Sequence, residues 1–114
     1  MAAAVVVPLW VLAFHWPAAR PGWAFDGSDL RIFFFGVREA VAAALRRGEL
    51  PWWQRGMFLG YPLVADPQAA VFHPTTWLTL PWDAPRALTL QTLLHLAIAG
   101  WGMLAWMRLR GLSP

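Results

Sequence analysis

The chain has 114 residues, of which 59% are hydrophobic and only 13% are charged, and nine of them are tryptophan. This charged fraction is well below the roughly 25% of soluble domains, so the composition favours a membrane environment. The net charge is +3, but apart from Arg46 and Arg47 the arginines are scattered. The sequence therefore lacks the basic patch of a nucleic-acid-binding protein, and the absence of cysteine excludes disulfides and cysteine-ligated metals.

The first segment, residues 1–16, is an almost continuous apolar run and is predicted to be a transmembrane helix. At about 1.5 Å per residue it reaches roughly 24 Å, short of the ~30 Å hydrocarbon core, so we expect a truncated or assisted span. Pro17 and the Pro21-Gly22 pair are expected to end it. A competing interpretation makes residues 1–19 the signal peptide of an exported soluble protein, although neither a basic start nor a clear cleavage site is present.

An amphipathic helix is predicted at about residues 29–47, with Ser28 as its N-cap and Gly48 as its stop. The apolar residues that recur with the helical period are Leu30, Phe33, Phe34, Val37, Val41, Ala44 and Leu45. The opposite side carries charged residues, among them Arg31 and Arg38. Such a pattern is typical of a surface helix that covers a core, but in a chain this small and apolar we favour a helix lying in the membrane interface.

The stretch from Gly48 to Pro74 combines prolines and glycines with many aromatic residues. It cannot form one long helix, and it is too apolar for a solvated linker. We therefore predict an ordered loop that lies against the membrane. Residues 69–80 continue it as a hydrophobic piece that is too short to cross a bilayer.

The second transmembrane helix is predicted at residues 86–107, because the apolar run from 87 to 107 gives about 32 Å of helix. Arg108 and Arg110 follow it directly and place residues 108–114 on the cytoplasmic side. Residues 17–85 then face outward. The fold class expected is an all-α integral membrane protein, with two transmembrane helices joined by an extracytoplasmic loop that carries interfacial amphipathic helices.

The loop also resembles a known family. The residues that carry the resemblance are Gly48, Leu50, Pro51 and Trp53, and then the run from Gly60 to Pro74 that reads GYPLVADPQAAVFHP. Further matches are Gly27 to Leu30, then Leu94, His95, Ala99 and Gly100, and finally Arg110 to Ser113. These residues are similar to the amino-terminal part of the YfhO-like bacterial membrane proteins, which resemble the C-type glycosyltransferase superfamily. The chain departs from that family at residues 52–55, which read WWQR, and at His73.

The resemblance implies a multi-pass protein of the bacterial cytoplasmic membrane that transfers a sugar from a polyprenyl-phosphate donor to a cell-envelope acceptor. This chain would be only its amino-terminal portion, inactive alone, with the lipid bilayer, the lipid-linked donor and the remaining transmembrane helices as partners. The superfamily places a catalytic aspartate in the first extracytoplasmic loop, which implies Asp29 as the base that accepts the proton of the acceptor hydroxyl. Asp26 is the second choice. Asp29 also suits the first turn of a helix, where a carboxylate stabilises the dipole without further role.

Arginines form planar forks that bind phosphate, so Arg31, Arg38 and Arg55 are candidates for the donor phosphate. The same residues also suit contacts with lipid headgroups. The three histidines lack the spacing of a metal site, and no metal ligands are assigned. A divalent metal held by Asp26 and Asp29 beside a phosphate stays open.

A different class of function also stays open. The chain would then be a small non-enzymatic integral membrane protein whose loop docks a partner, and Asp29 would serve only the helix terminus.

Overall fold

The computed structural model of the protein describes residues 2–112. Its regular elements in this range are helices, and the only β pairing there is an isolated antiparallel bridge between Gln54 and Tyr61. The described chain divides into two compact units. One comprises residues 2–24 and 89–112, and the other comprises residues 25–88. The predicted all-helical class is therefore confirmed for the described residues.

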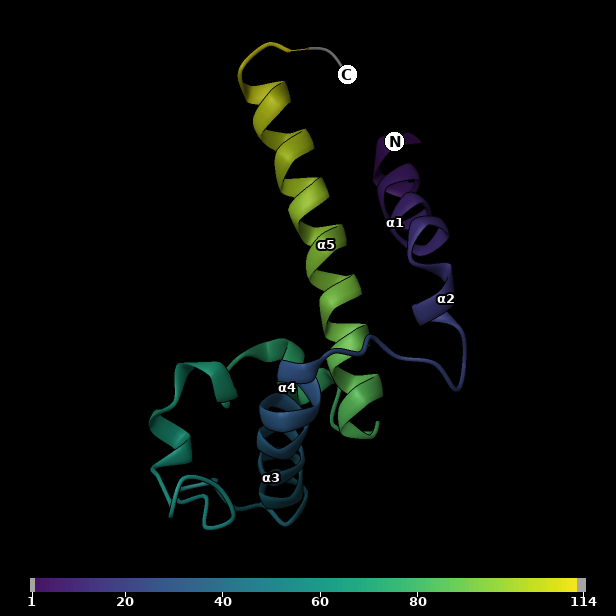
Figure 1. Ribbon diagram of the computed structural model, residues 1–114. Helices are drawn as coiled ribbons and strands as arrows, with labels where there is room; N and C mark the ends of the chain where they lie inside the picture. Colours follow the sequence, from purple (N-terminus) through teal and green to yellow (C-terminus); the bar gives the residue numbers. More distant parts are fainter. Residues whose placement is uncertain (1, 113–114) are drawn as a thin grey trace. The chain divides into compact units, whose positions relative to one another are not determined.

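The first unit begins with α1 (Ala2–Phe14) and the short α2 (Trp16–Ala19) (Figure 1). Of the two expected stops, Pro17 does not end the helical segment, because it lies in the first turn of α2. A proline is tolerated there, since the backbone N–H groups of a first turn have no partner within the helix. The Pro21-Gly22 pair does follow the end of the helical segment, since α2 ends at Ala19. At about 1.5 Å per residue the 13 residues of α1 reach roughly 20 Å.

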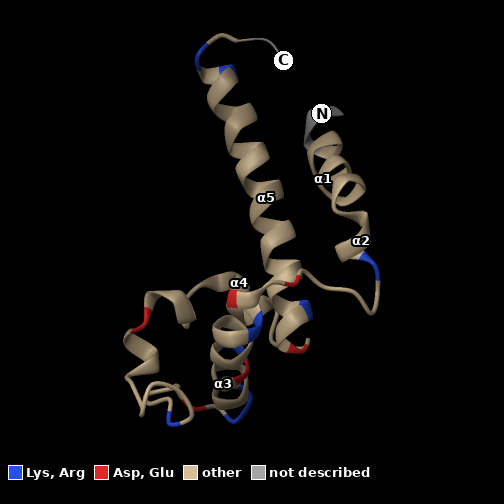
Figure 2. Ribbon diagram, in the orientation of Figure 1, with Lys and Arg blue, Asp and Glu red and all other residues tan. Residues whose placement is uncertain are grey.

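The long helix α5 (Ala84–Leu109) supplies the rest of this unit beyond residue 88. Its 26 residues extend about 39 Å, more than the ~30 Å of a hydrocarbon core. Its charged residues, Arg86 and Arg108, stand near its two ends, and the length between them is uncharged (Figure 2). Among the described residues, α5 alone is long and apolar enough to cross a membrane.

Helices α1 and α5 meet at a glycine. A Cβ atom added at Gly100 would lie 2.6 Å from Cγ1 of Val7, so only a residue without a side chain fits there. Ala97 and Leu93, one and two turns earlier on the same face of α5, are buried. Small residues allow this kind of close helix approach inside membranes.

The second unit is built around the predicted amphipathic helix, which forms as η1 (Leu30–Phe34), a π-helical turn, followed directly by α3 (Phe35–Arg46). Its start differs from the prediction, because Ser28 is already helical and the Gly27 carbonyl accepts the Arg31 N–H at 3.0 Å. Its end is as predicted. Gly48 has φ +75°, and the N–H groups of Gly48 and Glu49 return to the carbonyls of Leu45 and Ala44, each at 3.0 Å. This is a Schellman motif.

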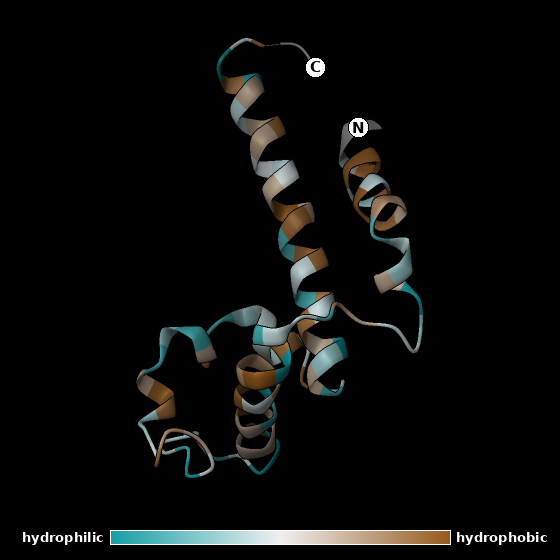
Figure 3. Ribbon diagram, in the orientation of Figure 1, coloured by the Kyte–Doolittle hydropathy of each residue, from teal (hydrophilic) through white to brown (hydrophobic). Residues whose placement is uncertain are grey.

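The apolar face of α3 packs on the loop that follows it. The buried residues of this core are Val37, Val41, Leu45, Leu63, Ala69 and Val71. The loop reaches the helix through two 3₁₀ turns, η2 (Leu63–Ala65) and η3 (Pro67–Ala69). The chain thus supplies its own apolar surface for α3, and this face is not the one available to lie in a membrane interface. Brown apolar segments in both α3 and the loop are visible in Figure 3.

Side-chain caps fix the remaining turns of the loop. The Asp66 carboxylate accepts the Gln68 N–H at 2.8 Å and begins η3. His73 accepts the Thr75 N–H at 3.3 Å and begins α4 (Pro74–Leu78), where Pro74 occupies the first turn. The indole N–H of Trp77 donates to the Val71 carbonyl at 3.0 Å. Asp66 and His73 therefore act in this unit as local capping residues.

Candidate functional site

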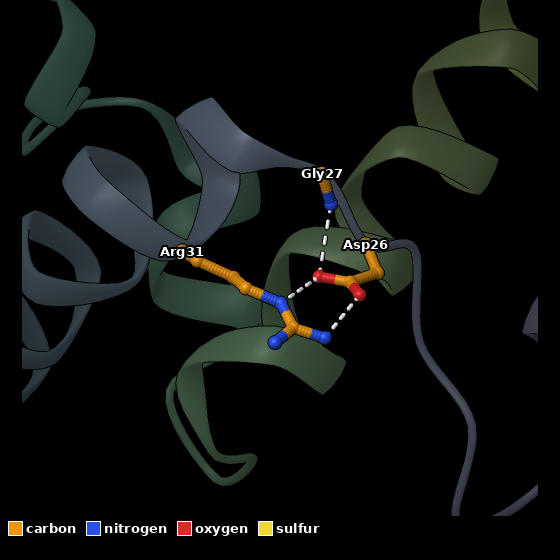
Figure 4. Close-up of polar contacts among 3 residues, drawn as sticks. All are labelled: Asp26, Gly27 and Arg31. Carbon is orange, nitrogen blue, oxygen red and sulfur yellow. Dashed lines mark hydrogen bonds and ion pairs between the residues drawn. The ribbon is translucent and has the colours of Figure 1, made fainter.

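Asp26 and Arg31, two of the residues singled out from the sequence, form an ion pair (Figure 4). Nε of Arg31 donates to Oδ1 of Asp26 at 2.6 Å, and Nη2 donates to Oδ2. The Gly27 N–H donates to the same carboxylate at 2.9 Å. The hydrogen bond from Arg31 lowers the pKa of Asp26, and the Asp26 carboxylate raises the pKa of Arg31. Both of Asp26's oxygens are thus occupied, which makes it a weaker base.

Asp29 follows in the first helical turn and is exposed. Its carboxylate makes no hydrogen bond or ion pair with any described residue, and it does not cap the π-helical turn that follows. Of the two carboxylates proposed for catalysis, Asp29 is therefore the one whose oxygens remain available to accept a proton from a substrate.

Arg38 lies in a different environment from the one its position suggested. The sequence places it on the polar side of the helix, but it is buried, with 4% of its surface exposed. Nη2 donates to the Thr76 carbonyl at 2.8 Å and to the Thr79 hydroxyl at 2.5 Å. Nε and Nη1 are buried without a hydrogen-bond partner among the described residues. Burial lowers the pKa of Arg38, and the nearby charge of Arg46 adds to the effect.

This placement has a local cause. Thr76 is in the last turn of α4, where backbone carbonyls lack partners within the helix. The Arg38 guanidinium supplies a donor to one of them. Arg38 therefore joins α3 to α4 in this structure and does not present an open fork to a ligand phosphate.

Arg55, the third arginine proposed for phosphate, is exposed and lines a pocket of about 430 Å³. Ala40, Ala43 and Ala44 of α3 form one wall. The segment that follows the helix forms the rest, with Arg47, Glu49, Trp52, Trp53, Gln54 and Arg55 among its lining residues. Sequence reasoning identified Arg55 but missed the pocket, because its two walls come together only through folding of the loop.

The five candidate residues do not form one site. Asp26, Asp29 and Arg31 lie at the start of the helix, whereas Arg55 lies beside its last turns. From Asp29 to Ala44 is 15 residues of continuous helix, or about 22 Å at 1.5 Å per residue. The second unit therefore holds a carboxylate site and a separate pocket with aromatic and charged walls.

Metal ligands do not gather in the described part of the chain. No group of three histidine, aspartate or glutamate residues within residues 2–112 is placed to hold an ion. Asp26 and Asp29 were considered as a metal-binding pair from the sequence. In the structure the Asp26 carboxylate is instead paired with Arg31.

Comparison with models of protein families, with curated proteins and with solved structures finds no match to this chain.

Proposed function

We propose that this chain is the amino-terminal part of a membrane glycosyltransferase-like protein that transfers a sugar from a polyprenyl-phosphate donor to a cell-envelope acceptor. In this arrangement α1 and α5 both enter the bilayer, and residues 17–85 face outward. The proposal rests on the family resemblance of the loop, and the observation that favours it is the exposed carboxylate of Asp29. The apolar length of α5 supports the membrane location.

The proposed reaction needs one base. The oxygen of the acceptor hydroxyl attacks the anomeric carbon of the donor, and its proton passes to the carboxylate of Asp29. The bond between the anomeric carbon and the phosphate oxygen breaks, and the lipid phosphate leaves with the electron pair. Asp26 serves this reaction indirectly, because its ion pair with Arg31 fixes the chain just before the helix that carries Asp29.

The test is made in the complete protein that begins with this chain. Asp29→Asn keeps the shape of the side chain and removes the base, so transfer of radiolabelled sugar from a lipid-linked donor should fall by about 10²-fold or more. Asp26→Asn is the matched control and should retain much more activity. Full transfer by a correctly folded Asp29→Asn protein would exclude Asp29 as the base.

A second candidate function is a non-enzymatic membrane protein whose loop docks a partner. It is favoured by two large apolar residues of the loop that lie open to solvent: Phe58 is 72% exposed and Leu59 is fully exposed. Under this alternative the protein forms a complex with its partner, which can be extracted from membranes and sized by native gel electrophoresis. Leu59→Asp should change the size of that complex, whereas Asp29→Asn should not. The opposite pattern, with sugar transfer lost only in Asp29→Asn, would favour the transferase.

A further inference from the structure

The pocket beside the end of α3 has the size of a small-molecule site and is lined by tryptophan side chains. Its volume of about 430 Å³ lies within the ~300–1,000 Å³ of small-molecule sites. Two of its lining side chains, Trp52 and Trp53, are 66% and 57% exposed. Indole rings in such a position offer broad apolar faces that an amphipathic ligand can cover.

The polar groups that line the pocket include both hydrogen-bond donors and hydrogen-bond acceptors. Arg55 supplies only donors. The Gln54 oxygen already accepts the Gly56 N–H at 3.1 Å, so Gln54 offers a ligand mainly the donors of its amide NH₂. Glu49 supplies acceptors. It shares one oxygen with Nε of Arg47 at 3.1 Å, in a pair that is exposed on both sides. The carboxylate and this arginine offset each other, so among the pocket's charged side chains Arg55 alone is left without an opposite charge.

The aromatic wall is held in place by the loop. Gly60 has φ +100°, and a Cβ atom there would lie 2.6 Å from Nε1 of Trp53, so the ring packs directly on glycine backbone. The bridge between Gln54 and Tyr61 closes the same hairpin, with N–H to carbonyl distances of 2.9 and 3.0 Å. An indole fixed in this way loses little freedom when a ligand binds.

We propose that this pocket binds a neutral pyranose ring of a glycan. The C–H face of a pyranose is apolar and matches the indoles, and its hydroxyls both donate and accept, as the polar wall requires. Binding of the sugar stands on the pocket's own geometry. Only its role as the subsite for an acceptor glycan rests on the proposed function, and the distance along the helix keeps it apart from Asp29.

The experiment uses the whole chain in lipid nanodiscs and measures saturation transfer by NMR to methyl α-pyranosides of glucose, galactose and mannose and to N-acetylglucosamine. At least one should receive saturation on its ring C–H protons. Trp53→Ala should weaken that binding about tenfold. Gly60→Ala should weaken it as well, because the new Cβ displaces the Trp53 ring.

Two control variants separate the pocket from general effects. Gly56→Ala lies in the same hairpin, and its Cβ would come no closer than 3.7 Å to Gln54, so binding should persist. Trp16→Ala removes an exposed indole of the other unit and should also leave binding unchanged. Far-UV circular dichroism checks that each variant is folded.

The inference is overturned if none of these pyranosides binds, or if Trp53→Ala and Trp16→Ala weaken binding equally. It is also overturned if inorganic phosphate binds in an Arg55-dependent way while the pyranosides do not. Repeating the titration in the Asp29→Asn chain separates the two proposals: unchanged pyranoside binding there supports the pocket whatever becomes of sugar transfer.

Discussion

At the scale of single residues, two arginines on the helix of the second unit donate to backbone carbonyls of a distant segment. Arg38 bonds to Thr76, and Arg46 donates to the carbonyl of Leu80 through Nη2 at 2.5 Å and to that of Trp82 at 3.0 Å. These carbonyls follow or end α4 and lack helical partners of their own. From the sequence, Arg38 was placed on the charged side of the helix, away from the core. The true role of both arginines depends on residues at least 34 positions away, so no local pattern could reveal it.

Arg38 offers a test of this structural role. Replacing it with alanine removes the packing of its stem and leaves a cavity, so the free energy of unfolding should fall by about 2–4 kcal/mol. Replacing it with methionine keeps most of the volume and removes a buried, half-satisfied charge, so stability should change by no more than about 1 kcal/mol. Denaturant unfolding in detergent micelles measures both. A methionine variant as unstable as the alanine variant would show that the guanidinium and its hydrogen bonds, and not the packing of the stem, stabilise the fold.

The ion pair of Asp26 and Arg31 predicts a pH dependence. Because the pKa of Asp26 is lowered from its ordinary value of 3.8, its small contribution to stability is present above that value and is lost as the pH falls through the lowered pKa. NMR titration of the Asp26 carboxyl carbon should therefore give a midpoint below 3.8. In Arg31→Gln the midpoint should rise. Identical midpoints in the two proteins would mean that the pair does not form in solution.

At the scale of elements, the local signal at Gly48 predicted the end of α3, whereas Ser28 proved to be already helical and not an N-cap. Gly48 was identified as the stop of α3 because left-handed backbone at that position favours glycine, and the Schellman bonds bear this out. The π-helical turn at residues 30–34 left no comparable signal. The buried face of α3 was recognised from its period, but its partner was taken to be lipid. The chain's own loop covers it, because Leu63 and Val71 return to the helix.

Two glycines of α5 provide a matched pair for the contact between α1 and α5. Gly100→Ala puts a methyl group into the stiff, β-branched Val7 and should cost about 1–3 kcal/mol. Gly102 has open space around it, so Gly102→Ala should gain up to about 1 kcal/mol of helix propensity. Thermal unfolding in micelles compares them. Adding Val7→Ala to Gly100→Ala should restore part of the loss, and a failure to do so would place the clash elsewhere.

At the scale of the whole molecule, composition alone favoured a membrane environment, and the length and apolar character of α5 agree with that prediction. Its carboxyl-terminal end carries the expected markers, since the guanidinium of Arg110 lies 5.4 Å from the ring centre of Trp106. Such aromatic and basic pairs are common at membrane surfaces. The second span, the outward loop and the enzymatic role stay predictions, because they depend on a bilayer and on ligands that lie outside the chain.

The most direct measurement of this account is the sidedness of the second unit. The chain contains no cysteine, so single cysteines can be introduced without background. Leu59 and Leu112 are suitable positions, because both side chains are exposed. In intact bacteria, a membrane-impermeant maleimide should label Leu59→Cys at once and should label Leu112→Cys only after the membrane is permeabilised. Labelling of Leu112→Cys alone in intact cells would place the loop in the cytoplasm and contradict the proposed transfer reaction.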